Sequence, residues 1–390
     1  MVAKTPRSFF ARCETTMREI GVALIGTKFM GKAHANAYRQ VRAFFAPAVS
    51  PKLMVACGTE LERTKEFAFR FGFARYTTDR EEAVAARDVD LVDICAPNDL
   101  HFPLAEAAAR NGKAVFCEKP LARNLEEAKA MLQAVSKAGV PHMICFNYRF
   151  FPAVQLAKKL ISEGALGEIR QFHALYLQDW GLAPGLPLTW RFQKERAGSG
   201  ALGDTAVHIV DLARFLVGEI AEVTGMLTTF IHERPLLNGS GTGKVTVDDT
   251  AAFLARFQSG ATGIFETSRV ALGRKNFMHI EINGSRGSIF WNAEDPNWLW
   301  LYSLDDPPAT RGFRRIMVTE NVHPYAKNWW PPGHILGYEH TFAHAVLEFC
   351  EALGEGRNPK PDFLDGVRAQ AVLEAVAASG ESRRWEKVPN

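Results

Sequence analysis

Three side chains in two separate motifs have the types and spacing that proton transfer requires. Lys119 stands in CEKP, at the end of the apolar run AVFC, where burial in a cleft is expected to lower the pKa of its ammonium. Asp204 and His208 stand in GSGALGDTAVHIVDLARFL, and their i, i+4 spacing places both side chains on one face of a helix near its N-terminus. A histidine titrates in the range needed to take the proton of a hydroxyl that loses a hydride. An aspartate one turn away can bind a neighbouring hydroxyl or orient the imidazole.

Each motif also has a purely structural explanation. A lysine at the start of a loop is ordinarily solvated. An aspartate that caps a helix and a histidine that packs against its neighbours would give the same D-x-x-x-H spacing. The occurrence of both motifs in one chain favours the chemical interpretation.

A glycine turn near the start of the chain predicts a nucleotide site. The segment GTKFMG, residues 26–31, follows the apolar run VALI and precedes the helical stretch KAHANAYRQV. Gly26 and Gly31 occupy the outer positions of the dinucleotide fingerprint G-x-G-x-x-G, where they allow a tight turn and close packing of helix on strand. Lys28 replaces the middle glycine, and it is tolerable there if it points outward or lies beside a phosphate. The alternative is a plain turn between a strand and a helix.

The end of the second apolar run leaves the choice of cofactor open. Dinucleotide folds place an acid there to bind the adenosine ribose, but this chain has Gly58 and Thr59, with Glu60 slightly late. The spacing from the first turn is also long, because FFAPAVSPK is inserted. Thr59 with Arg63 would suit a 2′-phosphate, so NAD and NADP both remain candidates.

The elements that must position these residues belong to the α/β class. From residue 20 to 146, short apolar runs alternate with amphipathic helical stretches, which predicts a parallel sheet in a Rossmann domain. After about residue 150, longer alternating runs carry the hairpin signals QSGA and NGSRGS, which predict a large, mainly antiparallel open sheet with helices on one side. The stretch HERPLLNGSGTGKVTVDD is expected to be an irregular surface loop.

We therefore divide the chain into a disordered extension (1–18), a dinucleotide-binding domain (19–146) and a C-terminal α+β domain (147–390). The extension is basic but lacks the apolar core of a secretory signal, and Met17 is an alternative start.

Composition excludes several classes of partner. The formal net charge is +3 and no apolar run approaches a membrane span, so neither nucleic acid nor a membrane is an expected partner.

The six cysteines lack zinc-type spacing and are expected to be small buried residues in the reducing cytoplasm. No metal site is expected, because the late histidines have no carboxylate or cysteine at ligand spacing. These are His323, His334, His340 and His344. His34, on the first helix, is expected to be a packed residue.

The motifs together resemble the Gfo/Idh/MocA family, the group of glucose–fructose oxidoreductase and inositol dehydrogenase. The resemblance extends from about residue 20 to near the end and rests on GTKFMGKAH, VDICAPNDLH, FCEKPLA, FNYR, YLQDW and the long run that contains Asp204 and His208. The runs YLQDW, WRFQK, AGSGALGD and FNYR are most similar to the levoglucosan dehydrogenase group of that family.

This resemblance implies an NAD(P)-dependent dehydrogenase that oxidises a secondary ring hydroxyl, at C3, of a pyranose, an anhydrosugar or a cyclitol. It implies that His208 is the base, that Lys119 polarises the reacting hydroxyl and shares its proton, and that Asp204 holds the adjacent hydroxyl. It also implies a homodimer or homotetramer that associates through the open sheet face.

The resemblance assigns further residues to the cofactor and the sugar. The residues expected at the nicotinamide cofactor are Gly26, Thr27, Lys28, Phe29, Met30, Gly31, Gly58, Thr59, Pro97, Asn98, His101, Glu118 and Lys119. The residues expected at the sugar are Tyr148, Trp180, Arg191, Asp204 and His208. Trp329 and Trp330 suit either stacking on a sugar or packing between domains.

Two rival functions remain. A redox-neutral enzyme of the same fold would oxidise C3, eliminate the glycosidic substituent and restore its bound NAD, with Tyr148 as a candidate second base. A nucleotide-sensing regulator would need no catalysis, and retention of Lys119, Asp204 and His208 argues against it.

Overall fold

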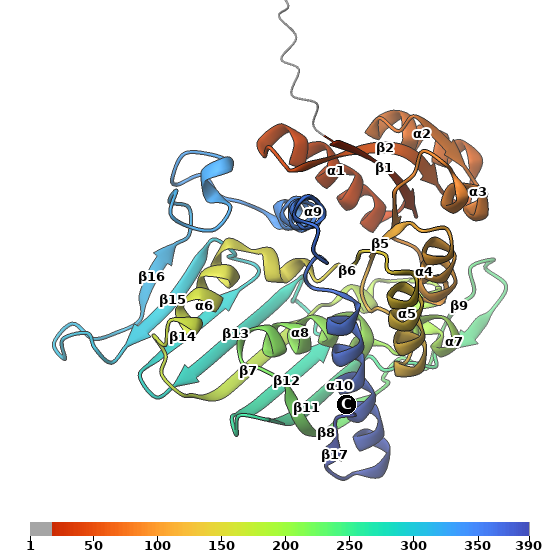
Figure 1. The fold of residues 1–390 in the computed structure, drawn as a ribbon. Coiled ribbons are helices and arrows are strands. Elements are labelled where there is room, and N and C mark those ends of the chain that lie inside the picture. Colours follow the sequence, from red (N-terminus) through yellow and green to blue (C-terminus); the bar gives the residue numbers. More distant parts are fainter. Residues whose placement is uncertain (1–17, 390) are drawn as a thin grey trace, which may run out of the picture.

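A computed structural model describes residues 18–389 of the chain. Of the extension predicted for residues 1–18, residues 1–17, which include Met17, lie outside the described residues. Arg18 begins the first strand. Figure 1 shows a smaller sheet flanked by helices and a larger, open sheet beside it.

The N-terminal sheet is entirely parallel, as predicted, with the strand order β3-β2-β1-β4-β5-β6 of a Rossmann domain. Its strands are β1 (Arg18–Ile25), β2 (Val49–Cys57), β3 (Arg75–Thr77), β4 (Leu91–Ile94), β5 (Ala114–Cys117) and β6 (His142–Ile144). Its helices are α1 (Phe29–Phe44), α2 (Leu61–Phe71), α3 (Arg80–Ala85), α4 (His101–Arg110) and α5 (Leu125–Ala138). The sequence did not predict strand β3, because this strand has only three residues and a single buried side chain.

The segment FFAPAVSPK is only partly an insertion. Its residues from Val49 onward belong to β2, where Pro51 pairs with Ile20 of β1. Proline has no N–H to donate to a neighbouring strand. It is accommodated because β3 pairs only with residues 55–57, which leaves this half of β2 as a sheet edge.

The C-terminal sheet has nine strands in the order β16-β15-β14-β13-β7-β12-β11-β8-β17. They are β7 (Ile169–Leu177), β8 (Ile220–Thr228), β11 (Thr250–Phe257), β12 (Thr262–Ser268), β13 (Phe277–Gly284), β14 (Gly287–Asn292), β15 (Trp298–Ser303), β16 (Arg314–Met317) and β17 (Glu386–Lys387). All pairs are antiparallel except β7 with β12. The two predicted hairpins are confirmed, β11–β12 around QSGA and β13–β14 around NGSRGS.

The prediction of an irregular loop between β8 and β11 is wrong in part. It contains a small antiparallel hairpin, β9 (Glu233–Pro235) with β10 (Thr242–Lys244). The apolar residues that flank the glycine-rich turn explain the pairing, because Leu236 and Val245 pack with Leu188 and Phe192 in a small separate core.

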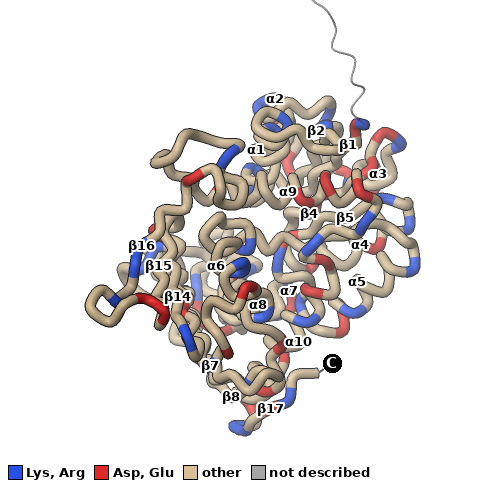
Figure 2. The backbone as a smooth tube through the Cα atoms, turned by 60° about the vertical axis from the view of Figure 1, so that its left-hand side comes forward, with Lys and Arg blue, Asp and Glu red and all other residues tan. Residues whose placement is uncertain are grey.

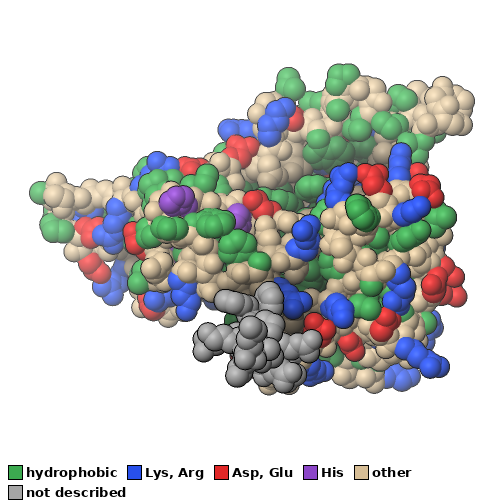
Figure 3. All heavy atoms as spheres, turned by 90° about the horizontal axis from the view of Figure 1, so that it is seen from above, with side chains coloured by type: hydrophobic (Ala, Val, Ile, Leu, Met, Phe, Trp, Pro, Cys, Tyr) green, Lys and Arg blue, Asp and Glu red, His purple; other side chains and the backbone are tan. Residues whose placement is uncertain are grey.

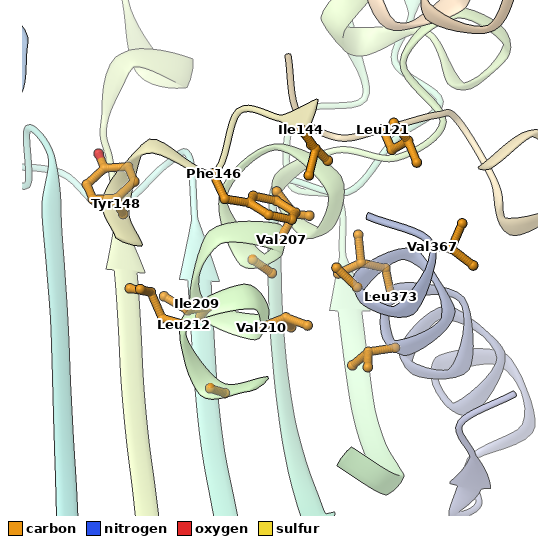
Figure 4. Packing of buried hydrophobic residues seen from close by; sticks show 14 of the residues in the cluster. Leu121, Ile144, Phe146, Tyr148, Val207, Ile209, Val210, Leu212, Val367 and Leu373 are labelled. Atoms are coloured by element: carbon orange, nitrogen blue, oxygen red, sulfur yellow. The ribbon is translucent and has the colours of Figure 1, made fainter. Parts of the chain in front are cut away.

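Helices cover one face of the large sheet and also join the two sheets (Figure 1). They are α6 (Pro152–Ser162), α7 (Lys194–Ala197), α8 (Val207–Leu216), α9 (Tyr338–Glu355) and α10 (Phe363–Ser382). Helix α9 packs against α1, and one buried core contains side chains of both. A second, larger core contains Ile209 and Leu212 of α8, which point toward the strands, and Tyr148, which lies at its border with the hydroxyl turned away (Figure 4).

Charged residues of both signs are interspersed along the backbone (Figure 2) and over the face seen in Figure 3. No helix within residues 18–389 has the length and apolar character that crossing a membrane requires. The described cysteines are all unpaired. Cys57, Cys117, Cys145 and Cys350 are buried as predicted, whereas Cys95 is only half-buried and Cys13 lies outside the described residues.

Candidate active site

Lys119 and Asp204 meet where β5 ends, although 85 residues separate them along the chain. Lys119 Nζ donates hydrogen bonds to Asp204 Oδ1 at 2.9 Å and to the Asp204 backbone oxygen at 2.8 Å. The Asp204 side chain retains 30% of its exposure, so the pair is fixed but remains accessible to a ligand. The two motifs singled out in the sequence therefore form one site.

The helix that carries Asp204 is not regular at this point. Residues 202–206 form a π-type turn that leads into α8, where the sequence predicts ordinary helix. Asp248 shapes this entry, because its carboxylate accepts hydrogen bonds from the backbone N–H of Gly200 at 2.7 Å and of Leu202 at 2.8 Å. A Cβ on Gly200 would lie 1.7 Å from the Asp248 backbone oxygen, so only glycine fits there. Such π turns occur frequently at functional sites.

Asp204 is held as a carboxylate. Burial alone would raise the pKa of this group. The cations Lys119, Arg269 and Arg191 outweigh burial and hold the pKa of the Asp204 carboxyl well below its usual range. Arg191 was expected near the sugar, whereas Arg269 was missed. Its Nε lies 3.8 Å from Asp204 Oδ2 and has no hydrogen-bond partner among the described residues.

His208 follows one turn later and is almost fully buried. Burial, reinforced by the Lys119 charge, lowers the pKa of His208 well below its ordinary value, and Asp204 opposes this only in part. Its Nδ1 has no hydrogen-bond partner within residues 18–389. The Tyr148 ring packs edge-on against the imidazole at 4.7 Å between centroids. The imidazole is therefore neutral near neutral pH and able to accept a proton.

A chain of polar side chains continues from His208 across the large sheet. The Tyr148 hydroxyl bonds to that of Tyr176 at 2.7 Å and receives a hydrogen bond from Asn276 Nδ2 at 3.1 Å. Asn276 Oδ1 accepts from Gln178 Nε2 at 2.7 Å, and Gln178 Oε1 accepts from Trp180 Nε1 at 2.8 Å. Tyr148 and Trp180, both predicted at the sugar, thus belong to one hydrogen-bonded wall.

Sequence reasoning missed three members of this wall and the Asp248 cap. Tyr176 and Gln178 both lie in the run YLQDW, residues 176–180, so the alternation at the end of β7 was the available signal. Asn276 lies just before β13, and no local pattern marks it.

The glycine turn fits a dinucleotide. Gly26 has a φ of 117°, which favours glycine, and a Cβ there would lie 2.4 Å from the Cys95 backbone oxygen. A Cβ on Gly31 would lie 1.8 Å from the Gly26 oxygen, so helix α1 approaches the strand closely. Lys28 precedes α1, and no side chain caps its N-terminus, which leaves the first N–H groups to a phosphate.

The neighbouring cavity has a volume of about 240 Å³ and is lined by Thr27, Lys28 and Thr59, with Arg63 close by. Gly58 is required at the end of β2, because a Cβ there would lie 2.2 Å from Thr64 Oγ1. This packing explains why no side chain stands at Gly58.

Models of two domains match the chain. The oxidoreductase family's NAD-binding Rossmann fold matches residues 20–146, and the GFO/IDH/MocA C-terminal domain matches residues 154–290. The chain belongs to the GFO/IDH/MocA oxidoreductase family. Its first domain is an NAD-binding Rossmann domain.

Several dehydrogenases of this family are similar to this chain over nearly its whole length. Levoglucosan dehydrogenase of Pseudarthrobacter phenanthrenivorans is 44% identical over 387 residues, which covers 96% of this chain and 99% of that protein. Myo-inositol 2-dehydrogenase of Thermotoga maritima is 30% identical over 368 residues, covering 94% and 98%. A levoglucosan dehydrogenase structure in complex with NADH and levoglucosan has a TM-score of 0.92 at 44% identity and covers 95% of this chain and 100% of that one. The chain is therefore an oxidoreductase of a family that contains NAD-dependent sugar and cyclitol dehydrogenases.

Other residues that the GFO/IDH/MocA resemblance assigns to the cofactor occupy the strand ends. Asn98 Nδ2 donates to the Ala197 backbone oxygen at 2.9 Å. His101 is fully buried, and its ring nitrogens bond to the backbone oxygens of Ala96 and Pro120 at 3.0 Å each. Both side chains thus fix loops around the site, and their contact with the cofactor stays a prediction. Phe29 is 65% exposed at the start of α1, with Met30, half-buried, behind it.

Glu118 belongs to a buried network that the sequence did not reveal. Its Oε1 lies 2.9 Å from His34 Nε2, and the Nδ1 of the same imidazole lies 2.9 Å from Asp93 Oδ2. With Cys95 and Cys145, these groups are close enough to form two candidate metal-ligand sets. We interpret them as a hydrogen-bonded ionic network, because each ring nitrogen already pairs with a carboxylate at hydrogen-bond distance.

The late histidines and tryptophans serve packing where they are buried. Trp329 Nε1 donates to His344 Nε2 at 2.7 Å, and the His344 Nδ1 bonds to the Phe150 backbone oxygen. Trp330, by contrast, is 45% exposed and packs edge-on against Phe44.

Proposed function

We propose that this protein oxidises a secondary ring hydroxyl, at C3, of a pyranose or anhydrosugar with NAD as the hydride acceptor. The observation that carries the proposal is the Lys119–Asp204 pair with the neutral His208 one helical turn away, at the end of β5. The similarity to levoglucosan dehydrogenase, including a complex with NADH and levoglucosan, supports this substrate class.

Each member of the trio has a distinct task in the proposed reaction. The bound nicotinamide supplies the acceptor for the hydride that leaves the carbon. His208 takes the hydroxyl proton, since its depressed pKa keeps the imidazole neutral near neutral pH. The Lys119 ammonium stabilises the negative charge that develops on the hydroxyl oxygen. Asp204, held ionised by its cationic neighbours, accepts a hydrogen bond from the adjacent hydroxyl.

The wall residues orient the sugar in this scheme. Trp180 and the Tyr148–Asn276–Gln178 chain present fixed donors and acceptors beside the trio, where Tyr148 packs against His208. Tyr148 is a poor second base for the redox-neutral alternative. Burial raises the pKa of its hydroxyl, although its hydrogen bonds with Tyr176 and Asn276 oppose that shift.

The open face of the large sheet supports association with a second copy. Met226, Leu254 and Ile264, on adjacent strands, are 64%, 46% and 48% exposed. Exposed apolar patches of this kind mark interfaces, and a twofold axis would cover the same patch on both subunits. Leu254→Arg should therefore shift the molar mass measured by light scattering toward that of the monomer, and an unchanged mass would reject this interface.

The direct test is a screen of the purified protein with NAD or NADP. Levoglucosan, glucose, glucosides, myo-inositol and scyllo-inositol would be compared by the near-ultraviolet absorbance of reduced nicotinamide. We expect reduction of NAD with levoglucosan or a related pyranose, and NMR of the product should show a 3-keto sugar. Nucleotide that stays bound and oxidised during turnover would instead favour the redox-neutral enzyme. His208→Ala is the control, which should bind NADH but lack turnover.

A further inference from the structure

A buried ionic network lies directly behind the segment that carries Lys119. His34 stands in the second turn of α1, Asp93 in β4 and Glu118 at the end of β5. His34 Nδ1 lies 2.9 Å from Asp93 Oδ2, and His34 Nε2 lies 2.9 Å from Glu118 Oε1. One imidazole thus bridges two carboxylates from neighbouring strands.

These groups have no access to water. His34 and Asp93 are 0% exposed and Glu118 is 4% exposed. The rings of Phe116 and Phe342 pack against the imidazole at 5.1 and 5.3 Å between centroids. Burying a charge is costly unless it is paired, so the network is stable only while its members remain together.

The partners determine the charge of the imidazole. Burial alone would lower the pKa of His34, but the groups around the ring, with the Asp93 carboxylate first among them, together outweigh burial, so that the pKa lies well above the ordinary value. The imidazolium in turn lowers the pKa of Glu118, although burial opposes this shift. The thiols of Cys95 and Cys145 also face the ring, and burial raises the pKa of each, so they stay neutral.

The second oxygen of Glu118 connects this network to the active site. Glu118 Oε2 accepts a hydrogen bond from the backbone N–H of Lys119 at 3.0 Å. Lys119 is consequently held twice, by Glu118 at its backbone and by Asp204 at its ammonium. Without the imidazolium, the buried Glu118 carboxylate must take a proton or turn toward water, and either change alters its bond to Lys119.

We propose that His34 is a positioning residue, whose positive charge behind Glu118 fixes the backbone of Lys119 and thereby aims its ammonium at the reacting hydroxyl. The effect on turnover rests on the proposed function, whereas the effect on the Lys119 side chain does not.

The test compares His34→Gln with His344→Gln. His344 is an equally buried histidine on α9, but its partners are a backbone oxygen and an indole, and burial lowers its pKa to about 3. The chemical reactivity of Lys119 would be measured by trace acetylation and mass spectrometry, relative to Lys159, whose side chain is 62% exposed. The turnover number kcat and the KM for the sugar would be measured alongside.

We expect acetylation of Lys119 to rise several-fold in His34→Gln and to stay at the wild-type level in His344→Gln. We also expect kcat to fall about 10-fold or more in His34→Gln alone, with little change in KM, because even a small displacement of a catalytic group strongly lowers the rate of the chemical step. Equal Lys119 reactivity in both variants would overturn the proposal.

Two features keep the outcome decisive. If no sugar is oxidised by the wild-type protein, the proposed function fails, while the acetylation result still decides the positioning role. If His34→Gln does not fold, Glu118→Gln replaces it. Its amide removes the negative charge but fits the same space, and it should change Lys119 reactivity if the ionic network holds that residue. Unchanged reactivity in a folded Glu118→Gln protein would equally overturn the proposal.

Discussion

The two sides of the CEKP segment hold histidines that differ in charge, one neutral and one positive. In front, His208 lies one helical turn from Asp204 and packs against Tyr148, and its Nδ1 has no partner among the described residues. Behind, His34 bonds to a carboxylate through each ring nitrogen. Both rings are buried, yet the pKa of His208 is lowered and that of His34 is raised.

The contrast teaches that partners, rather than burial, decide which histidine can act as a base. Desolvation disfavours the imidazolium at both positions. The Asp93 carboxylate leads the groups that reverse that preference at His34, whereas a neighbouring ammonium reinforces it at His208. The front histidine is therefore free to accept a proton, and the rear one is a fixed cation.

The largest effect should come from the front side. Lys119→Met removes the ammonium that stabilises the developing oxyanion, and we expect kcat to fall by about 1,000-fold. NADH affinity, measured by quenching of protein fluorescence, should remain close to that of the wild type. A variant that retained more than a tenth of wild-type turnover would contradict the role given to Lys119.

The polar wall should affect substrate binding more than chemistry. Asn276→Ala leaves Gln178 and the Tyr176 hydroxyl without their shared acceptor. We expect KM for the sugar to rise about 10-fold, with a smaller change in kcat, because orientation is lost while the trio stays in place. Steady-state kinetics would check this, and a fall in kcat alone would place Asn276 with the catalytic groups instead.

The two histidines should also give opposite pH dependence of stability. His34 has a raised pKa in the folded protein, so its contribution is complete below the unfolded value of about 6.5 and is lost as pH rises through the folded pKa. His208 has a lowered pKa, so stability is lost as pH falls from about 6.5 toward the folded pKa.

Denaturant unfolding over a range of pH would test this contrast. Compared with the wild type, His34→Gln should lose the fall in the free energy of unfolding on the alkaline side. His208→Gln should lose the fall in the free energy of unfolding that accompanies acidification below about pH 6.5. Identical pH profiles for the two variants would refute the assignment of opposite pKa shifts to the two histidines.

The smallest effect is expected for a surface lysine that pairs with Asp179 beside the wall. Lys275 Nζ lies 2.7 Å from Asp179 Oδ2, and the Lys275 side chain is 79% exposed. Because water screens such pairs, Lys275→Ala should change KM and kcat by less than about twofold. A larger change in steady-state kinetics would mean that charge near the cleft rim contributes to substrate binding.

Local pattern was sufficient for the front of the site and insufficient for the back. Lys119, Asp204 and His208 lie in motifs at a strand end and on a helix, and such positions can be inferred from periodicity. His34 meets Asp93 and Glu118 only through strand order and the close approach of α1, which no single stretch encodes. Sequence therefore predicted that His34 is packed and missed its charge.

The same reasoning accounts for the elements that were missed. Strand β3 is too short to show alternation, and the β9–β10 hairpin depends on packing against Leu188 and Phe192 from a distant segment. The π-type turn before α8 depends on Asp248, more than 40 residues away. Long-range contacts of this kind override local propensity.

Neutron diffraction from deuterated crystals at neutral pH would test the central claim most directly, because it locates deuterons on ring nitrogens. We expect deuterons on both nitrogens of His34 and on only one nitrogen of His208. A singly deuterated His34 or a doubly deuterated His208 would contradict the account, in which His34 is a cation and His208 is neutral.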